Sequence, residues 1–281
     1  MKIIRVFPRK TNATPMDALA VWPCGENPYA APDLFHEADE VHISVAFTWD
    51  LPKVKWLVRQ WQRVAPVKVG GPAFGKPAGE FIGGRYLKPG YTITSRGCPN
   101  RCWFCWVWRL QMGEVQELPI VDGWKVQDDN LLACSEQHIR AVFAMLKRQN
   151  RRAEFTGGLD VARLRGWHVN LLAEMRPRPV IFVAYDTPGD YEPLVASGRQ
   201  LLEAGFTRES HRLRCYVLIG YRGDTFSMAE ARLNAAWRAG FLPFAMLYRG
   251  EGGCTDPEWR RFQRSWCRPA ATCTKLRRSD T

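Results

Sequence analysis

Three cysteines lie within eight residues of one another, in the segment TSRGCPNRCWFCWV that spans residues 94–107. Cys98, Cys102 and Cys105 give the spacing Cys-x3-Cys-x2-Cys, beside a glycine and a proline. Three thiols suit neither a structural zinc site, which closes with four ligands, nor a disulfide, which takes two. An iron–sulfur cube binds thiolates on separate irons, so three thiolates leave one iron open unless a remote cysteine fills it. The spacing therefore predicts an iron–sulfur site with an open coordination position.

A zinc site and chance clustering could also account for the three cysteines. A distant Cys or His could complete a zinc site, or the cysteines could cluster by chance in a chain that has nine of them. Zinc modules more often show two separated pairs of ligands, and the chain has no second Cys-x2-Cys pair. Buried structural cysteines rarely crowd together beside Gly and Pro. The metal interpretation is favoured.

Strand-like and helical segments alternate after the cysteines. Helical patterns are predicted at 135–149, 191–205 and 226–240. Apolar, β-rich runs that predict strands lie at 153–158, 178–186, 212–220 and 241–250. The alternation predicts parallel strands covered by helices, in a sheet that is either barrel-like or doubly wound. In such folds the chemistry gathers at the carboxyl ends of the strands. Gly157, Asp186 and Gly220 are expected there, together with the cysteine loop.

The first 88 residues predict a smaller α/β unit. A strand at 40–48, a helix at 51–64 and a strand at 66–75 form a βαβ unit, which implies parallel pairing. The Pro- and Gly-rich stretch 70–90 is typical of a connector. The predicted organisation is a small α/β domain at 1–88, a core at 89–249 and a C-terminal extension at 250–281.

The chain is strongly basic, with 40 Lys and Arg against 28 Asp and Glu and a net charge of +12. Such a charge favours polyanionic partners, nucleic acid first, although a solvated basic surface gives the same count. Residues 259–278 carry seven of the basic residues and no acid. Trp259, Phe262 and Trp266 have helical spacing there, which favours packing. Contact with nucleic acid stays open for the arginines between them.

No apolar run approaches the ~20 residues that a membrane span requires, and the first residues lack the apolar core of a signal peptide. The expected location is therefore the reducing cytoplasm, without a membrane partner, where clustered cysteines indicate metal or redox chemistry. Cys254, Cys267 and Cys273 could hold an auxiliary cluster, but their spacings of 13 and 6 residues match no compact motif. Buried thiols are the favoured interpretation of these three.

The cysteine motif resembles that of the radical S-adenosylmethionine (radical SAM) superfamily. The shared pattern is Cys-x3-Cys-x-aromatic-Cys, with Phe104 before the last cysteine, on a loop after a first strand. The resemblance covers roughly residues 90–249 and implies a partial (β/α)6 barrel with a [4Fe-4S] cluster on Cys98, Cys102 and Cys105. In that family the open iron is chelated by the amino and carboxylate groups of S-adenosylmethionine (SAM). Reductive cleavage of SAM then releases methionine and a 5′-deoxyadenosyl radical, which abstracts hydrogen from the substrate.

The resemblance also implies contacts with SAM. Gly157 and Gly158 match the glycines of a Gly-Gly-Glu segment that meets the amino group of the methionine moiety. Leu159 stands where the family has the acid, and Asp160 follows it, so the side-chain contact is displaced. Small residues at this place let a ligand approach the backbone closely.

Four further positions match the adenosine side of the family's site. The resemblance implies adenine packing by Phe104, ribose contacts by Asp186, and a strand-to-turn element near adenine at Gly220 and Tyr221. The run VQDDNLLA, with Asp128 to Asn130, is similar to an acidic segment that lines some family sites. Its composition is equally typical of an ordinary turn.

The N-terminal unit is similar to the later half of the Rossmann-like, cobalamin-binding-like domain found before the radical core in one large subfamily. The Asp-x-His-x-x-Gly signature that supplies a cobalt ligand is absent, and His36 and His42 stand in other contexts. A vestigial or substrate-facing domain is therefore favoured over bound cobalamin. Methylthiotransferase relatives carry three cysteines in this domain, whereas this chain has only Cys24, which disfavours that chemistry.

The sequence thus predicts a radical SAM enzyme, with a nucleic-acid or nucleotide substrate suggested by charge alone. Two alternatives stay open: a radical SAM enzyme acting on a peptide or small molecule, and a non-enzymatic iron–sulfur or zinc protein that binds nucleic acid. Gly157 and Gly158 weigh against the second, because a binding module needs no cofactor cleft. Reductive chemistry implies a reductant protein of the flavodoxin or ferredoxin type as partner.

Overall fold

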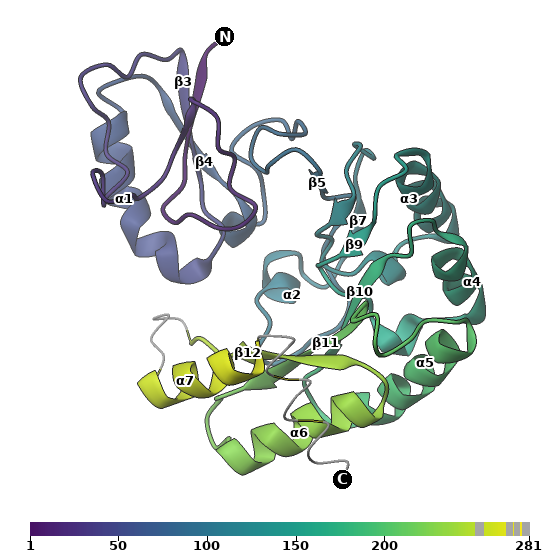
Figure 1. Cartoon of the computed structure of the whole chain (residues 1–281). Helices are drawn as coiled ribbons and strands as arrows, with labels where there is room; N and C mark the ends of the chain where they lie inside the picture. The colour runs from purple at the N-terminus through teal and green to yellow at the C-terminus, as the bar shows by residue number, and fades with distance from the viewer. Residues whose placement is uncertain (251–255, 268–271, 273–275, 277–281) are drawn as a thin grey trace.

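The computed structural model describes residues 1–250, 256–267, 272 and 276. Figure 1 shows two larger sheets, one formed by the N-terminal residues and one by the rest of the chain. Every strand pair within these two sheets is parallel, and helices pack against both. The predicted α/β class is confirmed.

The N-terminal sheet has four strands in the order β2-β1-β3-β4. They are β1 (Ile3–Val6), β2 (Ala20–Val21), β3 (Glu40–Ser44) and β4 (Val67–Gly70). The predicted βαβ unit is confirmed, with α1 (Leu51–Trp61) between β3 and β4 and with Val41 in register with Val67. The sequence prediction lacked β1 and β2, which are too short to show a periodic pattern. With β1 inside the sheet, the strand order is that of doubly wound α/β units.

The second sheet has six strands in the order in which the chain makes them. They are β5 (Tyr91–Thr92), β8 (Lys125–Val126), β9 (Glu154–Phe155), β10 (Val180–Tyr185), β11 (Leu213–Ile219) and β12 (Leu242–Leu247). Right-handed crossovers between strands in sequential order put their helices on one side. The doubly wound alternative, which requires the order to reverse, is wrong for this sheet. The two edge strands β5 and β12 are not paired with each other in the described part of the chain.

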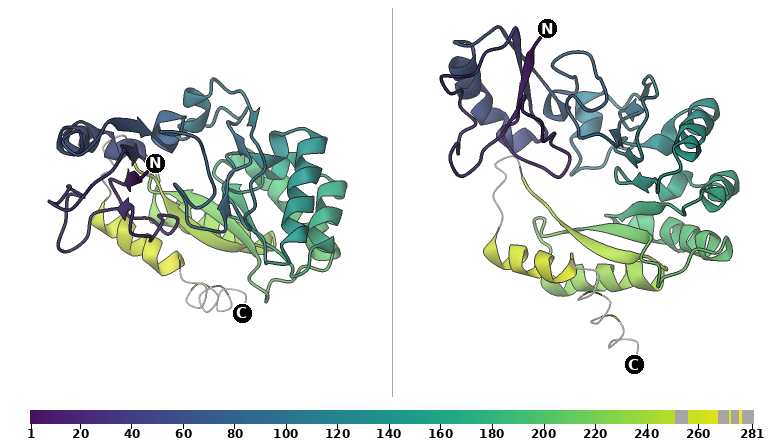
Figure 2. Two further views of the ribbon diagram at one scale, coloured as in Figure 1. Left: turned by 90° about the horizontal axis from the view of Figure 1, so that it is seen from above. Right: turned by 45° about the horizontal axis from the view of Figure 1, so that its top comes forward.

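Four helices follow one another along one side of the second sheet (Figures 1 and 2). They are α3 (Glu136–Arg148), α4 (Gly166–Glu174), α5 (Tyr191–Glu203) and α6 (Phe226–Arg238). Ser135 caps α3 as predicted, accepting a hydrogen bond from the backbone N–H of His138 at 3.2 Å. The predicted apolar face of α3 is buried in the core, including Val142 and Phe143. Of the helices in the described ranges, none is both long and apolar enough to cross a bilayer.

The segment between β5 and β8 carries the three cysteines. It contains β6 (Ser95–Arg96), the short helix α2 (Val107–Leu110) and β7 (Gln116–Glu117). Strands β6 and β7 pair antiparallel, so the segment leaves the sheet and returns as a small ribbon. Short 3-10 helices follow several strands: η1 (Thr48–Asp50), η2 (Pro72–Phe74), η3 (Leu131–Ala133), η4 (Val161–Arg163) and η5 (Pro188–Asp190).

Helix α7 (Pro257–Trp266) packs its aromatic stripe against the second sheet. Trp266 is 1% exposed, and Trp259 and Phe262 contact the same core. The ring of Trp259 lies 4.4 Å from that of Phe226, which begins α6. The packing interpretation of these aromatic residues is confirmed: Trp266 is buried, and Trp259 and Phe262 are partly buried against the same core.

Trp266→Ala is expected to lower the free energy of unfolding by about 3–5 kcal/mol, because it leaves a large cavity at a buried site. Urea denaturation followed by circular dichroism measures the change. Arg264→Gln, an exposed substitution on the same helix, serves as the control and is expected to cost less than about 0.5 kcal/mol. Equal small effects of the two substitutions would contradict the packing of α7.

Candidate functional site

The cysteine loop lies between β6 and α2, beyond the carboxyl end of β5. Cys98, Cys102 and Cys105 are free thiols and are partly exposed. The loop turns tightly at its second half, where the N–H of Cys105 donates to the carbonyl of Cys102 at 3.1 Å. The indole N–H of Trp108 donates to the same carbonyl at 2.9 Å. The turn brings Cys102 and Cys105 to one side of the loop.

Two consecutive aspartates after β8 hold the start of the cysteine loop. The Asp128 carboxylate accepts from the N–H of Thr94 at 2.6 Å, from its hydroxyl at 2.5 Å and from the hydroxyl of Ser95 at 3.0 Å. The Asp129 carboxylate accepts from the guanidinium of Arg96 at 3.0 Å and from the N–H of Gly97 at 2.9 Å. Asp128 is 2% exposed, and burial raises its pKa. Asp128 and Asp129, in the run VQDDNLLA, therefore hold the cysteine loop in place by hydrogen bonds.

Two glycines make the close approach of these segments feasible. Gly97 has a φ of +89°, and a Cβ there would lie 1.8 Å from the carbonyl oxygen of Glu114. A Cβ on Gly157 would lie 2.1 Å from the carbonyl oxygen of Asp128. Any side chain at either position would push the backbone segments apart. Gly157 thus packs the turn after β9 against the turn after β8.

Asn130 links Cys98 to the segment after β9, which carries Asp160. Its side-chain amide donates to Cys98 Sγ at 3.3 Å and to the Asp160 carboxylate at 3.0 Å. Asp160 also accepts from the side-chain amide of Asn100, inside the cysteine loop, at 2.9 Å. The predicted residue Asp160 therefore lies beside the loop, whereas Leu159 is buried in the core. The displacement of the acid by one residue is what allows this contact.

The thiols fit a site for a cationic metal centre. The pKa of Cys102 is raised to about 11 by burial, by the neighbouring Cys105 and Cys98, and then by Asp186 and Asp190. Burial likewise raises the pKa of Cys105. A metal that binds Cys102 and Cys105 must therefore displace protons that these two thiols hold more tightly than an ordinary thiol does. Soft thiolates are the ligands that iron–sulfur clusters use.

A single metal ion has different requirements from a cluster. In the parts of the chain that the structure describes, no group of three or more His, Cys, Asp or Glu side chains is arranged to hold one metal ion. The ligands of a single ion must converge on one point. Each thiolate of a cube binds a different iron, so that convergence is not required of Cys98, Cys102 and Cys105.

Asp186 follows β10, and its charge contributes to the raised pKa of Cys102. Its carboxylate accepts from the backbone N–H of Leu218 on β11 at 3.1 Å. Burial and then the nearby Asp190 raise its pKa to about 7. Asp190 itself accepts hydrogen bonds from the N–H of Asp186 and from Thr187. A carboxyl group in this state can either accept or donate a hydrogen bond near neutral pH.

Aromatic rings connect the cysteine loop to the ends of the last two strands. The ring of Trp103 lies 5.4 Å from that of Phe104, 5.5 Å from that of Tyr221 after β11, and 5.5 Å from that of Tyr248 after β12. Gly220 has a φ of +71°, and its N–H donates to Asp224 at 2.7 Å. The predicted residues Phe104, Gly220 and Tyr221 are thus brought to the same end of the sheet as the cysteines.

Sequence reasoning missed three residues of this region. Asn100 gives no signal in the sequence, because its partner Asp160 is 60 residues away. Trp103 stands inside the cysteine motif and Tyr248 at the end of the last predicted strand. The position of Trp103 within the motif and that of Tyr248 at a strand end were the signals that could have identified these two residues.

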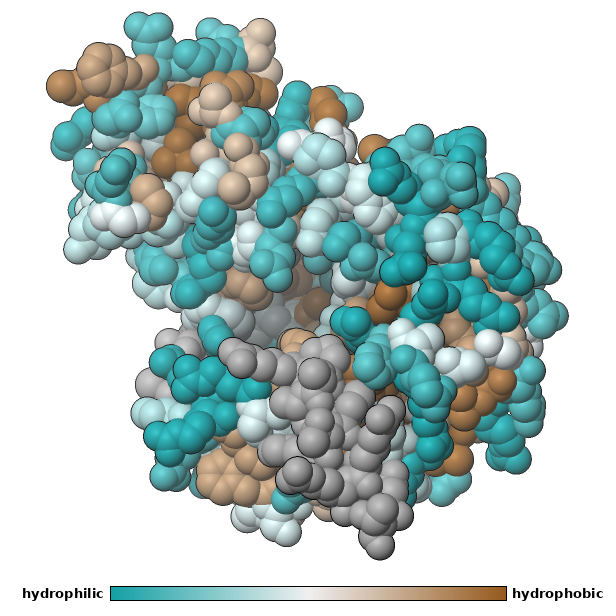
Figure 3. All heavy atoms as spheres, in the orientation of Figure 1, coloured by the Kyte–Doolittle hydropathy of each residue, from teal (hydrophilic) through white to brown (hydrophobic). Residues whose placement is uncertain are grey.

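The N-terminal unit contacts the same region. The side-chain amide of Gln111, at the end of α2, donates to the carbonyl of Gly75 at 3.0 Å. The guanidinium of Arg249, after β12, lies 5.4 Å from the centre of the Trp49 ring, which follows β3. Figure 3 shows a hollow between the N-terminal unit and the second sheet, with apolar residues on its floor, where Figure 1 draws α2.

The two N-terminal histidines have structural partners. His42 is 2% exposed, and its ring nitrogens contact the Tyr86 hydroxyl at 2.7 Å and the Glu40 carboxylate at 2.8 Å. His36 pairs with Asp33 at 2.8 Å, and its ring packs edge-on against Trp61. Both ring nitrogens of His42 are therefore engaged within the protein.

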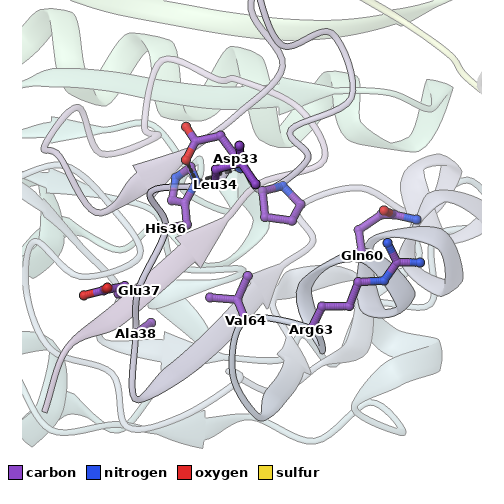
Figure 4. Close-up of a pocket in the computed structure, with 9 residues that line it drawn as sticks. Asp33, Leu34, His36, Glu37, Ala38, Gln60, Arg63 and Val64 are labelled. Atoms are coloured by element: carbon purple, nitrogen blue, oxygen red, sulfur yellow. Dashed lines mark hydrogen bonds and ion pairs between the residues drawn. The ribbon is translucent and has the colours of Figure 1, made fainter.

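A second hollow lies on the outer side of the N-terminal unit. Figure 4 shows Asp33 and His36 on one side of it, and Gln60 and Arg63 from the end of α1 on the other. None of the residues predicted to bind the cluster or SAM lines it. It is separate from the cysteine loop.

Of the three C-terminal cysteines, only Cys267 lies among the described residues. Its thiol is directed at the carbonyl of Ala245 on β12, at 3.4 Å, and burial raises its pKa to about 11. Cys267 thus packs against the sheet, as expected of a buried thiol. Cys254 and Cys273 lie outside the described residues, and the expectation about an auxiliary cluster stays a prediction.

Cys102→Ala is expected to reduce the iron bound after anaerobic reconstitution to near zero, because a cube that loses one of three local ligands is not retained. Cys24→Ala, which removes an exposed thiol outside the loop, is the matched control and is expected to bind iron like the unchanged chain. Iron and sulfide assays with the visible absorbance spectrum measure the result. A full iron complement in Cys102→Ala would contradict the ligand assignment.

Asp186→Asn is expected to flatten the pH dependence of stability in the metal-free chain. With a pKa near 7 in the folded state, the carboxyl holds a proton that the unfolded chain loses near pH 4, so stability falls as the pH rises between about 4 and 7. The substitution removes this loss, on the order of 2–4 kcal/mol. Urea denaturation at several pH values tests it, with exposed Asp122→Asn as control. Parallel pH profiles of Asp186→Asn and the unchanged chain would contradict it.

The site therefore consists of a three-cysteine loop, fixed by the turns after β8 and β9 and facing Asp186 and an aromatic group. Its residues come from the carboxyl ends of neighbouring parallel strands, where α/β proteins hold their ligands. Comparison with protein-family models and with curated proteins finds no match to either.

Proposed function

We propose that this chain is a radical SAM enzyme, which uses a [4Fe-4S] cluster to cleave SAM reductively and modify a substrate. The observation that carries the proposal is the position of the three-cysteine loop, directly after the first strand of a six-stranded parallel sheet in sequential order. We further propose that the second sheet and its helices form a partial (β/α)6 barrel. The N-terminal unit before it would be a Rossmann-like domain related to cobalamin-binding domains.

Cys98, Cys102 and Cys105 are the proposed cluster ligands. When bound, the cluster would leave one iron for the amino and carboxylate groups of SAM and would supply the electron that splits its sulfonium. The chain's own contribution is to fix the thiols in place. Asp128 and Asp129 hold the entry to the loop, and the amide of Asn130 holds Cys98.

The residues proposed to bind SAM follow the successive strands of the sheet. Gly157 and Gly158 come after β9, in the turn that also carries the Asp160 carboxylate; their N–H groups bond to the carbonyls of Val126 and Phe155, which leaves their carbonyl groups as the proposed contacts with SAM. Asp186 comes after β10, where it can exchange hydrogen bonds with hydroxyl groups. Gly220 and Tyr221 come after β11, and the rings of Tyr221 and Phe104 offer apolar faces of the kind that pack on adenine.

The floor of this region is shielded from solvent. Asp128 and Asn130 are 2% and 3% exposed beneath the loop, and the N-terminal unit contacts Gln111 at the end of α2 and Arg249 after β12. The cysteines above this floor are partly exposed, so the site is open to a substrate. We propose that the N-terminal unit faces the substrate and that a reductant protein of the flavodoxin or ferredoxin type delivers the electron in the cytoplasm.

The test is the reductive cleavage of SAM. The anaerobically reconstituted chain is expected to form 5′-deoxyadenosine with dithionite and SAM, measured by mass spectrometry. Cys98→Ala is expected to form none, whereas Cys24→Ala, the control outside the loop, is expected to match the unchanged chain. A fully loaded cluster that yields no 5′-deoxyadenosine, with candidate substrates added, would contradict the proposal and favour a binding or electron-transfer role.

A further inference from the structure

An exposed group of aromatic side chains borders the cysteine loop. We call it the aromatic rim: Trp103 with its partly exposed ring neighbours Tyr221 and Tyr248, and Trp106, three residues farther along the same loop. Trp103 is 50% exposed and Trp106 is 37% exposed. Large aromatic side chains that remain this exposed beside a functional site are typical of ligand-binding surfaces.

Arginines accompany the rim, and acids are missing from its main segment. The Arg109 guanidinium lies 5.3 Å from the centre of the Trp106 ring and 5.4 Å from that of Trp108. Arg249, next to Tyr248, is exposed and lies over Trp49. Residues 95–113 contain three arginines and no Asp or Glu. Arg96 is paired with Asp129, so the positive charge that accompanies the exposed rings comes from Arg101, Arg109 and Arg249, which are exposed.

This combination suits one kind of partner. Single-stranded nucleic acids are bound by aromatic rings that stack on bases and by arginines that contact phosphates or stack as planes. A duplex hides the faces of its bases, so a stacking surface favours single strands. A peptide would not require the excess of positive charge.

We propose that the aromatic rim binds a single-stranded nucleic acid, with a base stacked on Trp103, as the substrate of the site. This inference rests on the proposed function, because it names the substrate class for the same site. It places the nucleic-acid surface at the cysteine loop and not on α7, where Trp266 is buried in the core and Trp259 and Phe262 pack partly buried against it. The arginines of the rim contact the backbone on either side of the stacked base.

Fluorescence anisotropy with labelled single-stranded RNA and DNA of one sequence tests the proposal, on the reconstituted chain without SAM. Trp103→Ala is expected to weaken binding about 5- to 150-fold, as the loss of one stacked base does. Trp56→Ala is the matched control, because Trp56 is 40% exposed on α1 and its ring neighbour is Tyr29. Iron content is measured for each variant, so that a damaged cluster is separated from lost binding.

Arg249→Gln provides a second variant outside the cysteine loop. It is expected to weaken binding and to reduce the slope of log affinity against log salt by about 1. Arg199→Gln, an exposed substitution on α5, is expected to leave the slope unchanged. The proposal requires weaker binding to the matching duplex than to the single strand.

The outcomes separate this proposal from the proposed function. Failure to bind, equal binding to the duplex, or equal losses in Trp103→Ala and Trp56→Ala would overturn the aromatic rim as a nucleic-acid site, even if 5′-deoxyadenosine is formed. Selective binding that Trp103→Ala and Arg249→Gln weaken would support it, whether or not SAM is cleaved. Comparison of the RNA and DNA strands then identifies which of the two is preferred, because only RNA carries the 2′-hydroxyl.

Discussion

The structure depends on a set of hydrogen bonds between the turn after β8 and the loop after β5. Three consecutive residues of that turn bind three successive positions of the cysteine-bearing segment. Asp128 accepts from Thr94, Asp129 accepts from Gly97, and Asn130 donates to Cys98. A buried carboxylate is costly unless it is fully hydrogen-bonded, and Asp128 receives three hydrogen bonds from Thr94 and Ser95. Any other position of the loop would leave the buried Asp128 carboxylate without these hydrogen bonds, so the free energy favours the observed position.

The same contacts couple the loop to the rest of the sheet. Gly157 allows the turn after β9 to touch Asp128, and Asp160 joins Asn130 to Asn100. On the other side, Trp103 connects the loop to Tyr221 and Tyr248 at the ends of the last two strands. Each strand end of the sheet thus contributes to one site, because parallel strands in sequential order present all their carboxyl ends together. The N-terminal unit adds two contacts: the Gly75 carbonyl accepts from Gln111, and the Trp49 ring lies under Arg249.

The parts of this arrangement that could be predicted from the sequence are those with a pattern in neighbouring residues, such as an apolar run or a helix cap. Strands β10, β11 and β12 have six or seven residues each, long enough to show an apolar run, and Ser135 marks the start of α3. Strands β5, β8 and β9 have two residues each, too few for any periodicity; β9 lies within the predicted strand at 153–158, whereas VQDDN fitted a site-lining acidic segment and an ordinary turn equally well. The role of Asp128 depends on Thr94, 34 residues away, and no local pattern records that distance. The net charge predicted a polyanionic partner, and the helical spacing of Trp259, Phe262 and Trp266 correctly predicted that these rings pack against the core.

The central claim is that Cys98, Cys102 and Cys105 hold a cluster with one iron open to SAM. Electron paramagnetic resonance of the reconstituted, dithionite-reduced chain tests it most directly, with and without SAM. We predict a reduced-cluster signal that changes when SAM is added, because a ligand on one iron alters the electronic structure of the whole cluster. A reduced-cluster signal that is identical with and without saturating SAM would contradict it.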